Sequence, residues 1–168
     1  MNTLVVGGTG MLAGVLKGLL DAGEQVYSVS RHAPKQRHER LHPLLLDYHD
    51  LDALQAALQA YAPFDRAVVW IHSSAPAAPL VVAEAVQGDY FHVLGSAAAD
   101  PARPDPARRS RFEALGVHYQ EIILGFQPVQ GGSRWLSHAE ISAGVWQALQ
   151  SRSPRSVVGT VEPWEARP

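Results

Sequence analysis

Closely spaced glycines near the N-terminus suit the binding of a dinucleotide. Gly7-Gly8-Thr9-Gly10 follows an aliphatic run, Thr3 to Val6, and precedes leucines at helical spacing. Such a turn lets a pyrophosphate approach the backbone, while the N–H groups and dipole at the start of the helix favour its charge. We therefore expect five residues to contact a cofactor: Gly7, Thr9, Gly10, Met11 and Leu12. The alternative is a glycine turn that only packs a strand against a helix.

This strand, glycine turn and helix resemble the start of the short-chain dehydrogenase/reductase superfamily, in particular its extended and atypical members. The resemblance covers most of the chain and implies an NAD(P)-binding Rossmann fold. In that family an acid at the end of the second strand binds the ribose of NAD, whereas an arginine there pairs with the 2′-phosphate of NADP. This chain has Ser30-Arg31 and no acid. The resemblance therefore implies NADP(H), unless Arg31 is an ordinary solvated cation.

Three further strand ends match cofactor positions of the family. Asp47-Tyr48 follows the third predicted strand, where the family places residues beside the adenine. His72-Ser73-Ser74-Ala75 follows the fourth strand and corresponds to a segment beside the ribose, in which we select His72 and Ser73. Gly125 follows the sixth strand, beside the nicotinamide. The alternatives are local: Asp47 can begin the helix turn, and the segment at His72 can cap the next helix.

The catalytic residues of the family are only partly present. Ser96 follows the fifth strand, at the position of the serine that polarises the substrate carbonyl, although it can also be a turn residue. The Tyr-x-x-x-Lys pair that donates the proton is absent, since the only lysines are Lys17 and Lys35. The remaining candidate donors are Tyr119, which we take as the catalytic candidate, and Tyr90, His92 and His72.

The missing pair leaves three functional hypotheses open. One of these other groups donates the proton, or the substrate needs none, as in direct hydride transfer to a flavin or quinone. In the third hypothesis the protein binds the dinucleotide without catalysis. We expect an NADP(H)-dependent oxidoreductase that transfers hydride to a small organic acceptor; the alternative is a noncatalytic dinucleotide sensor or partner-binding module.

A zinc-protease pattern, His38-Glu39-Arg40-Leu41-His42, has the wrong surroundings. The two histidines of this signature bind one metal ion only when they project from successive turns of a helix. Here Pro43 follows at once, and the segment lies in a predicted loop between two strands. We therefore predict no metal site.

The elements that must position these residues alternate along the chain. Strands are predicted at Thr3–Val6, Gln25–Val29, Leu44–Leu46, Arg66–Ile71, Tyr90–Leu94 and Val117–Leu124, with an optional edge strand at Ser156–Val161. Helices are predicted after the glycine turn, after an Asp50 cap, over Pro76–Gln87 and Pro106–Leu115, and after a capping box at Ser137–Glu140. The pattern predicts an α/β fold: a doubly wound Rossmann domain over residues 1–161, with a parallel sheet of six or seven strands and helices on both faces. Residues 162–168 form an irregular tail.

Composition restricts the class of protein further. The 168 residues are 46% hydrophobic with a formal net charge of −2, so we expect no binding to nucleic acid. The chain has no cysteine, which excludes disulfides and cysteine-ligated metals. It also lacks an apolar run long enough to span a membrane and shows no signal-peptide pattern, so we expect a soluble cytoplasmic protein. The small substrate region leaves room for a second copy of the chain to complete the pocket, as a homo-oligomer.

A glycine-rich segment, Gly131 to His138, precedes the last helix. It is predicted as a loop, either one that covers a ligand or a connection in which Trp135 packs as a hydrophobic staple.

Overall fold

The fold centres on one parallel sheet of seven strands. A computed structural model describes residues 1–7 and 9–168. The strand order is β3-β2-β1-β4-β5-β6-β9, so the order reverses direction between β1 and β4. This is the doubly wound α/β arrangement that the sequence predicts. The strands are β1 (Asn2–Val6), β2 (Gln25–Ser30), β3 (Leu41–Leu45), β4 (Phe64–Trp70), β5 (Val86–Leu94), β6 (His118–Leu124) and β9 (Arg155–Val158).

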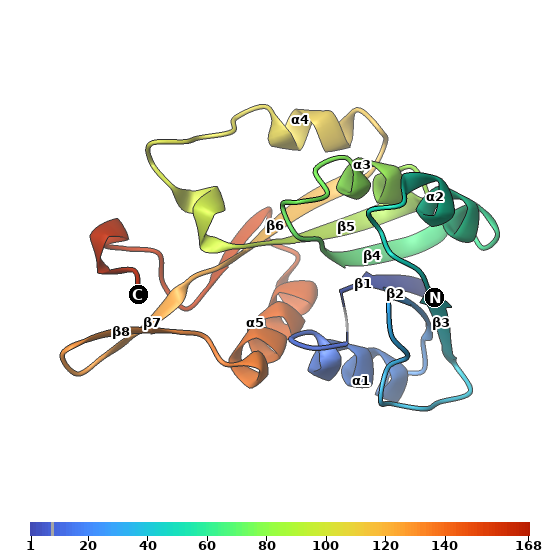
Figure 1. Ribbon diagram of the computed structural model, residues 1–168, viewed down its shortest axis with the longest axis horizontal. Coiled ribbons are helices and arrows are strands. Elements are labelled where there is room, and N and C mark those ends of the chain that lie inside the picture. The colour runs from blue at the N-terminus through green and yellow to red at the C-terminus, as the bar shows by residue number, and fades with distance from the viewer. Residues whose placement is uncertain (8) are drawn as a thin grey trace.

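Helices cover both faces of the sheet (Figure 1). One face carries α1 (Ala13–Asp21) and α5 (His138–Ser151). The opposite face carries α2 (Leu51–Gln59), α3 (Ala78–Ala83) and α4 (Arg108–Glu113). Right-handed crossovers between parallel strands produce this two-sided covering. None of the described helices combines the length and apolar character needed to cross a bilayer.

The core consists of two apolar layers, one on each side of the sheet. Successive strand residues point to opposite faces, so Val5 and Val68 pack toward α1 and α5, while Leu4 and Val69 pack toward α2 and α3. All four side chains are fully buried. A parallel strand buried on both faces reads as a continuous hydrophobic run, which is why the sequence alone indicates these strands.

The first and last α-helices are in close contact. Ser142 Oγ donates to the Met11 carbonyl oxygen at 2.6 Å and accepts the Gly14 N–H at 3.2 Å. A Cβ built on Gly14 would lie 2.8 Å from Ser142 Cβ, and one on Gly18 would lie 2.7 Å from the Trp146 ring. The glycines of α1 therefore allow the helix that follows the glycine turn to pack tightly on α5.

The helix starts agree with the predicted caps. The Asp50 side chain accepts the Ala53 N–H at 3.1 Å. Ser137 and Glu140 form a reciprocal capping box, in which each side chain accepts the other residue's N–H. These caps follow local rules that depend on neighbouring residues alone.

Several predicted boundaries were wrong. Strand β3 begins at Leu41 rather than Leu44 and includes Pro43, which is tolerated because β3 is an edge strand. The helix predicted over Pro76–Gln87 is the shorter α3, because β5 already begins at Val86. Gly88, at φ 125°, lies where the pairing of β4 with β5 is irregular. The first residues of β5 therefore lack the regular strand pattern by which the sequence would have indicated its start.

The glycine-rich segment is an antiparallel hairpin rather than a loop. Strand β7 (Phe126–Val129) pairs with β8 (Gly132–Trp135) around a turn in which Gly131 has φ 81°. Trp135 is 51% exposed, so the staple interpretation was wrong for this residue, and Leu136 packs on the core instead. Short 3-10 helices occur at Ser96–Ala99 and, in the predicted irregular tail, at Trp164–Ala166.

Candidate functional site

The carboxyl ends of the central strands meet at one edge of the sheet, where the strand order reverses between β1 and β4. Open α/β sheets bind ligands at this place, because the loops on the two sides of the reversal diverge. Two neighbouring cavities lie along this edge, and Trp70 and His72 line both.

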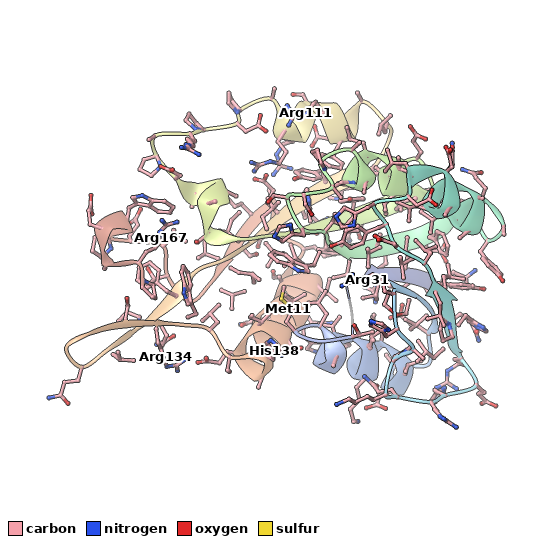
Figure 2. All side chains as sticks on the ribbon, in the orientation of Figure 1. Met11, Arg31, Arg111, Arg134, His138 and Arg167 are labelled. Atoms are coloured by element: carbon pink, nitrogen blue, oxygen red, sulfur yellow. The ribbon has the colours of Figure 1, made fainter. Side chains whose placement is uncertain are left out.

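The first, which we call the β2–β3 cavity, has a volume of about 420 Å³. It brings together residues from the ends of β1, β2, β3 and β4. Seven predicted site residues line it: Gly7, Thr9, Ser30, Arg31, Asp47, Tyr48 and His72. Arg31, labelled in Figure 2, is an exposed side chain at this cavity.

Hydrogen bonds link the residues of this cavity across the ends of β3 and β4. His49 Nδ1 lies 2.6 Å from Asp47 Oδ1, and His49 Nε2 lies 2.8 Å from Ser74 Oγ. The Tyr48 hydroxyl accepts the His72 N–H at 3.0 Å. Hydrogen bonds from the backbone and ring of His49 lower the pKa of Asp47 below its ordinary value. The cavity is therefore held in shape while Asp47 stays ionised.

Asp47, His49 and Ser74 have the residue types of a hydrolytic triad, but the surroundings do not suit acyl transfer. A serine nucleophile needs backbone N–H groups directed at the oxyanion. The Ser74 N–H donates to His72 Nδ1 at 3.0 Å, and the Ala75 N–H donates to the His72 carbonyl oxygen at 3.0 Å. The two amides nearest to the hydroxyl are thus already engaged.

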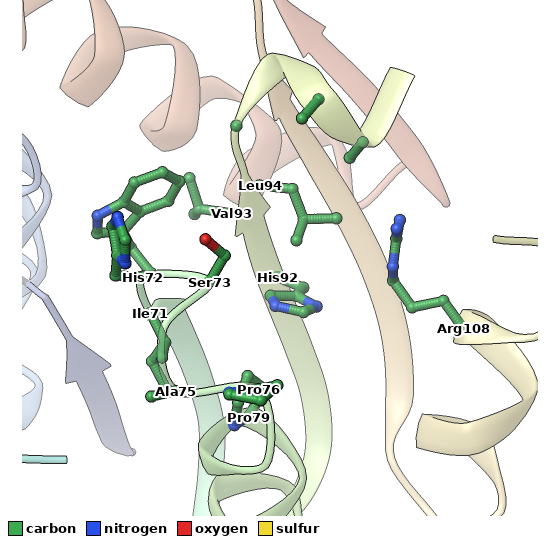
Figure 3. A pocket seen from close by; sticks show the side chains of 14 residues that line it. Ile71, His72, Ser73, Ala75, Pro76, Pro79, His92, Val93, Leu94 and Arg108 are labelled. Atoms are coloured by element: carbon green, nitrogen blue, oxygen red, sulfur yellow. The ribbon is translucent and has the colours of Figure 1, made fainter. Parts of the chain in front are cut away.

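The second, the β4–β5 cavity, has a volume of about 570 Å³ and a mostly apolar lining. Figure 3 shows the His92 ring between the β4–α3 loop, which carries Ser73 and Ala75, and Arg108 of α4. A cavity of this size and character suits a small, largely apolar molecule. The lining residues are Trp70, Ile71, His72, Ser73, Ala75, Pro76, Pro79, His92, Val93, Leu94, Gly95, Ala97, Ala98 and Arg108.

A chain of polar side chains leads to this cavity from β6. Arg108 Nη1 donates to Glu121 Oε2 at 3.0 Å, and the same carboxylate oxygen lies 3.3 Å from the Tyr119 hydroxyl. That hydroxyl lies 2.7 Å from His92 Nδ1. Burial, followed by the charge of Arg108, lowers the pKa of His92 to about 3. His92 is therefore a neutral imidazole at physiological pH.

Tyr119 itself does not line either cavity. It is 1% exposed and stacks on Phe112 with ring centroids 4.6 Å apart. Burial and the nearby Glu121 carboxylate raise the pKa of Tyr119 above its ordinary value. Its role as proton donor stays a prediction, and in this geometry its contact with the cavity runs through His92.

The other predicted site residues lie outside the cavity linings. Gly10, Met11 and Leu12 occupy the turn before α1, and Figure 2 shows Met11 and His138 in this region. Ser96 begins a 3-10 helix beside the β4–β5 cavity, whose lining includes its neighbours Gly95 and Ala97. Gly125 packs on the backbone of Thr160, which leaves no room for a Cβ. Gly8 lies outside the described residues.

Several lining residues were not singled out from the sequence as site residues. His49 and Ser74 contact each other only because the loops after β3 and β4 lie close together. Trp70 is the last residue of β4, where a strand residue is usually assigned to the core. Arg108 comes from α4, and its direction toward the cavity depends on the ion pair with Glu121. A sequence signal existed for Ser74, which directly follows the selected Ser73, and for His49, which lies two residues after the selected Asp47.

The histidines of the zinc-protease pattern are not on a helix. His38 Nδ1 accepts the Arg40 N–H at 3.0 Å, and His42 lies on β3 with Nε2 2.7 Å from Gln25 Oε1. Among residues 1–7 and 9–168, no cluster of three or more histidine or acidic side chains has the geometry to hold a metal ion.

Comparisons with known proteins identify the fold. No protein-family model matches the sequence, and no curated protein matches it. Solved structures do match, at low sequence identity. A short-chain dehydrogenase from Burkholderia cenocepacia J2315, solved in complex with NADP, has a TM-score of 0.67 and 15% identity, over 95% of this chain and 88% of the other. This chain has the fold of the short-chain dehydrogenases.

Two other solved structures have the same fold. A putative epimerase from Bacteroides thetaiotaomicron matches with a TM-score of 0.64 and 15% identity, over 96% of this chain and 97% of the other. ChuY, an anaerobillin reductase from Escherichia coli O157:H7, matches with a TM-score of 0.61 and 16% identity, over 97% and 98% of the two chains. The Rossmann fold implied by the sequence resemblance is thereby confirmed.

Proposed function

We propose that this protein is an NADP(H)-dependent oxidoreductase that reduces a small organic acceptor. The observation that carries the proposal is the arrangement of two cavities along one edge of the sheet, with Trp70 and His72 common to both. One cavity includes the glycine turn and an exposed arginine, and the other is mostly apolar. A dinucleotide bound across the first would direct its reactive end toward the second.

The residues at the glycine turn fit the phosphates of a dinucleotide. A Cβ built on Gly10 would meet only His138 Cε1, at 3.9 Å, so the space above this turn is open. Helix α1 begins immediately after it, at Ala13, and helix N-termini favour phosphate. Thr9 lines the adjoining cavity and offers a hydroxyl. Gly7, Thr9, Gly10, Met11 and Leu12 would thus surround the diphosphate.

The end of β2 favours the phosphorylated cofactor. Arg31 lines the β2–β3 cavity and is exposed, so its guanidinium is accessible to a 2′-phosphate. Ser30 Oγ donates to the His32 carbonyl oxygen at 2.7 Å, and this bond fixes the start of the loop that carries Arg31. Asp47 and Tyr48 would border the adenine, and His72 and Ser73 the ribose. The relative from Burkholderia cenocepacia was solved with NADP, which supports the same choice.

The β4–β5 cavity would receive the acceptor. NADPH supplies a hydride when it is bound, and the protein must then orient the acceptor and exclude water. The apolar side chains Ile71, Val93 and Leu94 line the cavity. They would bind an apolar body by burying it. ChuY, with the same fold, is described as a reductase, which is compatible with this chemistry.

A noncatalytic dinucleotide sensor is the second candidate. It is favoured by one observation: neither Ser96 nor Tyr119 lines the acceptor cavity. A sensor would bind NADPH without consuming it, whereas an oxidoreductase would also oxidise it in the presence of an acceptor.

Calorimetric titration with NADPH and NADH, followed by a turnover assay, tests the proposal. We expect tight NADPH binding, weak NADH binding, and NADPH oxidation with at least one member of a panel of aromatic ketones, aldehydes and quinones. Binding without turnover would favour the sensor. The absence of binding to either dinucleotide would contradict both candidates.

A further inference from the structure

His92 is buried in the wall of the β4–β5 cavity and also lines a smaller cavity of about 140 Å³ between α3 and α4. The residue is 5% exposed. Its ring packs edge-on against Phe112, with centroids 5.1 Å apart, and against Tyr90 and Tyr119, each 5.7 Å away. Three aromatic contacts and a hydrogen bond at Nδ1 therefore fix the direction of the ring. Such fixation places Nε2 at a constant position.

The contact at Nδ1 determines which nitrogen carries the proton. The Tyr119 hydroxyl has one proton and two possible acceptors: His92 Nδ1 at 2.7 Å, and Glu121 Oε2, to which it can donate at 3.3 Å. The shorter distance favours donation to Nδ1, and Glu121 already accepts from Arg108 at 3.0 Å. A neutral imidazole that accepts at Nδ1 carries its proton on Nε2.

The cavity around Nε2 contains few competing partners. Among the described residues, no hydrogen bond to His92 Nε2 is found. The other side chains that line the cavity are mostly apolar, such as Ile71, Val93 and Leu94. Arg108, the cation at the rim, is paired with Glu121 and Asp105. A hydrogen-bond donor in an apolar cavity selects a ligand that carries an acceptor atom at the matching point.

We propose that the His92 Nε2–H donates to the carbonyl oxygen of a mostly apolar ketone or aldehyde in the β4–β5 cavity, and that Tyr119 is the positioning residue that holds His92 in this tautomer. The inference rests on the proposed oxidoreductase function and names the substrate class and the group that binds it. His92 thereby takes the polarising role that the sequence resemblance implies for Ser96.

The reduction balances without a titrating acid in the cavity. The carbonyl carbon accepts the hydride that converts NADPH to NADP⁺, and the electron pair of the C=O π bond moves to the oxygen. The Nε2–H stabilises this negative oxygen, as donors in an oxyanion hole do. The oxygen then takes a proton from water, which enters beside the exposed residues His72, Ser73 and Pro76, and the hydroxide that remains leaves by the same route and takes up a solvent proton. His92 stays neutral throughout.

The tautomer and the ligand contact are measured directly by NMR. Protein labelled with ¹⁵N at the histidine rings is observed at pH 7, first alone, then with saturating NADP⁺, and then with acetophenone as the probe. We expect a protonated Nε2 in the protein alone and a shift of Nε2 on addition of acetophenone. A proton on Nδ1, or an Nε2 signal that acetophenone does not move beyond its position in the NADP⁺ complex, would each overturn the proposal.

Three variants complete the test. His92→Phe should lower kcat for NADPH-dependent reduction of the best carbonyl acceptor by about 10²- to 10³-fold, the effect of losing one oxyanion donor. His92→Gln, which retains an N–H donor, should recover part of this loss. Tyr119→Phe should produce mixed tautomers and a smaller fall in kcat, whereas an unchanged tautomer in this variant would overturn its positioning role. Affinity for NADPH should be unaltered in all three.

Tyr90→Phe is the matched control for Tyr119→Phe. Tyr90 belongs to the same aromatic cluster, but its hydroxyl donates to the Pro79 carbonyl oxygen at 2.8 Å rather than to His92. The Tyr90→Phe variant should therefore leave the tautomer of His92 unchanged. Failure of the proposed function would show separately, as the absence of NADPH binding in calorimetry. The tautomer of His92 and the shift caused by acetophenone are measured without reduced cofactor, so they test the role of His92 independently.

Discussion

The indole of Trp70 lies against the backbone of Gly7, the first residue of the glycine turn. A Cβ built on Gly7 would stand 2.5 Å from the Trp70 carbonyl oxygen and 3.1 Å from its Cδ1 atom. Gly7 also has φ 83°, a conformation that L side chains rarely adopt. This glycine is therefore required for packing and for backbone conformation before any ligand is considered.

Replacement of Gly7 should destabilise the fold more than an equivalent change elsewhere. Gly7→Ala combines the left-handed φ with a collision against main-chain atoms, which have little freedom to move. Gly23→Ala provides the matched control, because Gly23 has φ 88° and a Cβ added to it would meet no atom within 4 Å. We expect Gly23→Ala to cost about 1–2 kcal/mol and Gly7→Ala at least about 1–3 kcal/mol more, measured by urea denaturation. Equal losses of unfolding free energy in the two variants would show that the close approach of Trp70 adds nothing to the cost of a side chain at Gly7.

Replacement of Gly10 should separate cofactor binding from stability. Gly10 has space for a methyl group in the free protein, so Gly10→Ala should change the unfolding free energy by less than about 0.5 kcal/mol. If a diphosphate lies over this turn, the methyl group obstructs it, and we expect NADPH affinity to fall about tenfold or more in calorimetry. Gly132→Ala at the start of β8, where a Cβ meets no atom within 4 Å, is the control. Undiminished affinity in Gly10→Ala would place the diphosphate elsewhere.

Reversal of the charge at Arg31 should change cofactor preference. Arg31→Glu removes a charge-assisted hydrogen bond to the 2′-phosphate and adds repulsion, so NADPH affinity should fall about 10- to 100-fold while NADH affinity is retained or improved. Arg37→Glu makes the same charge change in the same loop, but Arg37 does not line the β2–β3 cavity. Both variants are titrated at two salt concentrations. Equal losses of NADPH affinity in Arg31→Glu and Arg37→Glu would indicate a long-range electrostatic effect rather than a specific contact of Arg31 with the 2′-phosphate.

The start of α5 should give the stability a dependence on acidic pH. Bidentate hydrogen bonds from Arg134, at 2.7 and 3.1 Å, and the Ser137 N–H lower the pKa of Glu140 to about 2 from 4.5. A carboxylate with a lowered pKa in the folded state stabilises it above pH 4.5, and this contribution is lost as the pH falls toward 2. Glu140→Gln keeps the capping box and removes the charge. Its stability should therefore be lower than that of the parent protein above pH 4.5, and the two should converge near pH 2.

Denaturation curves between pH 2 and 6 measure this convergence. Glu165→Gln serves as the control, since Glu165 is exposed and no ion pair is found for it among the described residues. A difference in unfolding free energy between the parent protein and Glu140→Gln that stays constant from pH 2 to 6 would contradict the lowered pKa of Glu140.

The sequence predicted those parts of the fold that local patterns determine. The strands buried on both faces are continuous apolar runs, and the caps at Asp50 and Ser137 depend on residues three positions apart. The β7–β8 hairpin was missed because its pairing, with Phe126 opposite Trp135, joins segments whose alternation is weak. The start of β5 was missed because Gly88 interrupts its regular pairing.

The residues of the candidate site were predictable where the family pattern assigns a cofactor contact to the residue that follows a given strand. Arg31, Asp47 and His72 were found in this way and line one cavity. The polar chain from Arg108 to His92 was not predictable, because its members come from α4, β6 and β5 and meet only through the sheet register. In that register His92 pairs with Glu121, so the two side chains lie on the same face of the sheet. Side chains alternate along a strand, so Tyr119, two residues before Glu121, lies on this face as well.

The contact of Ser142 with the turn of α1 has a consequence for how the protein is made. The serine, on α5, hydrogen-bonds the Met11 carbonyl oxygen and the Gly14 N–H, which lie 131 and 128 positions earlier in the sequence. During synthesis the segment with the glycine turn emerges well before the helix that braces it, because β2 to β8 lie between α1 and α5 in the sequence. The nascent chain therefore acquires a fully supported glycine turn only after α5 has been translated and has docked.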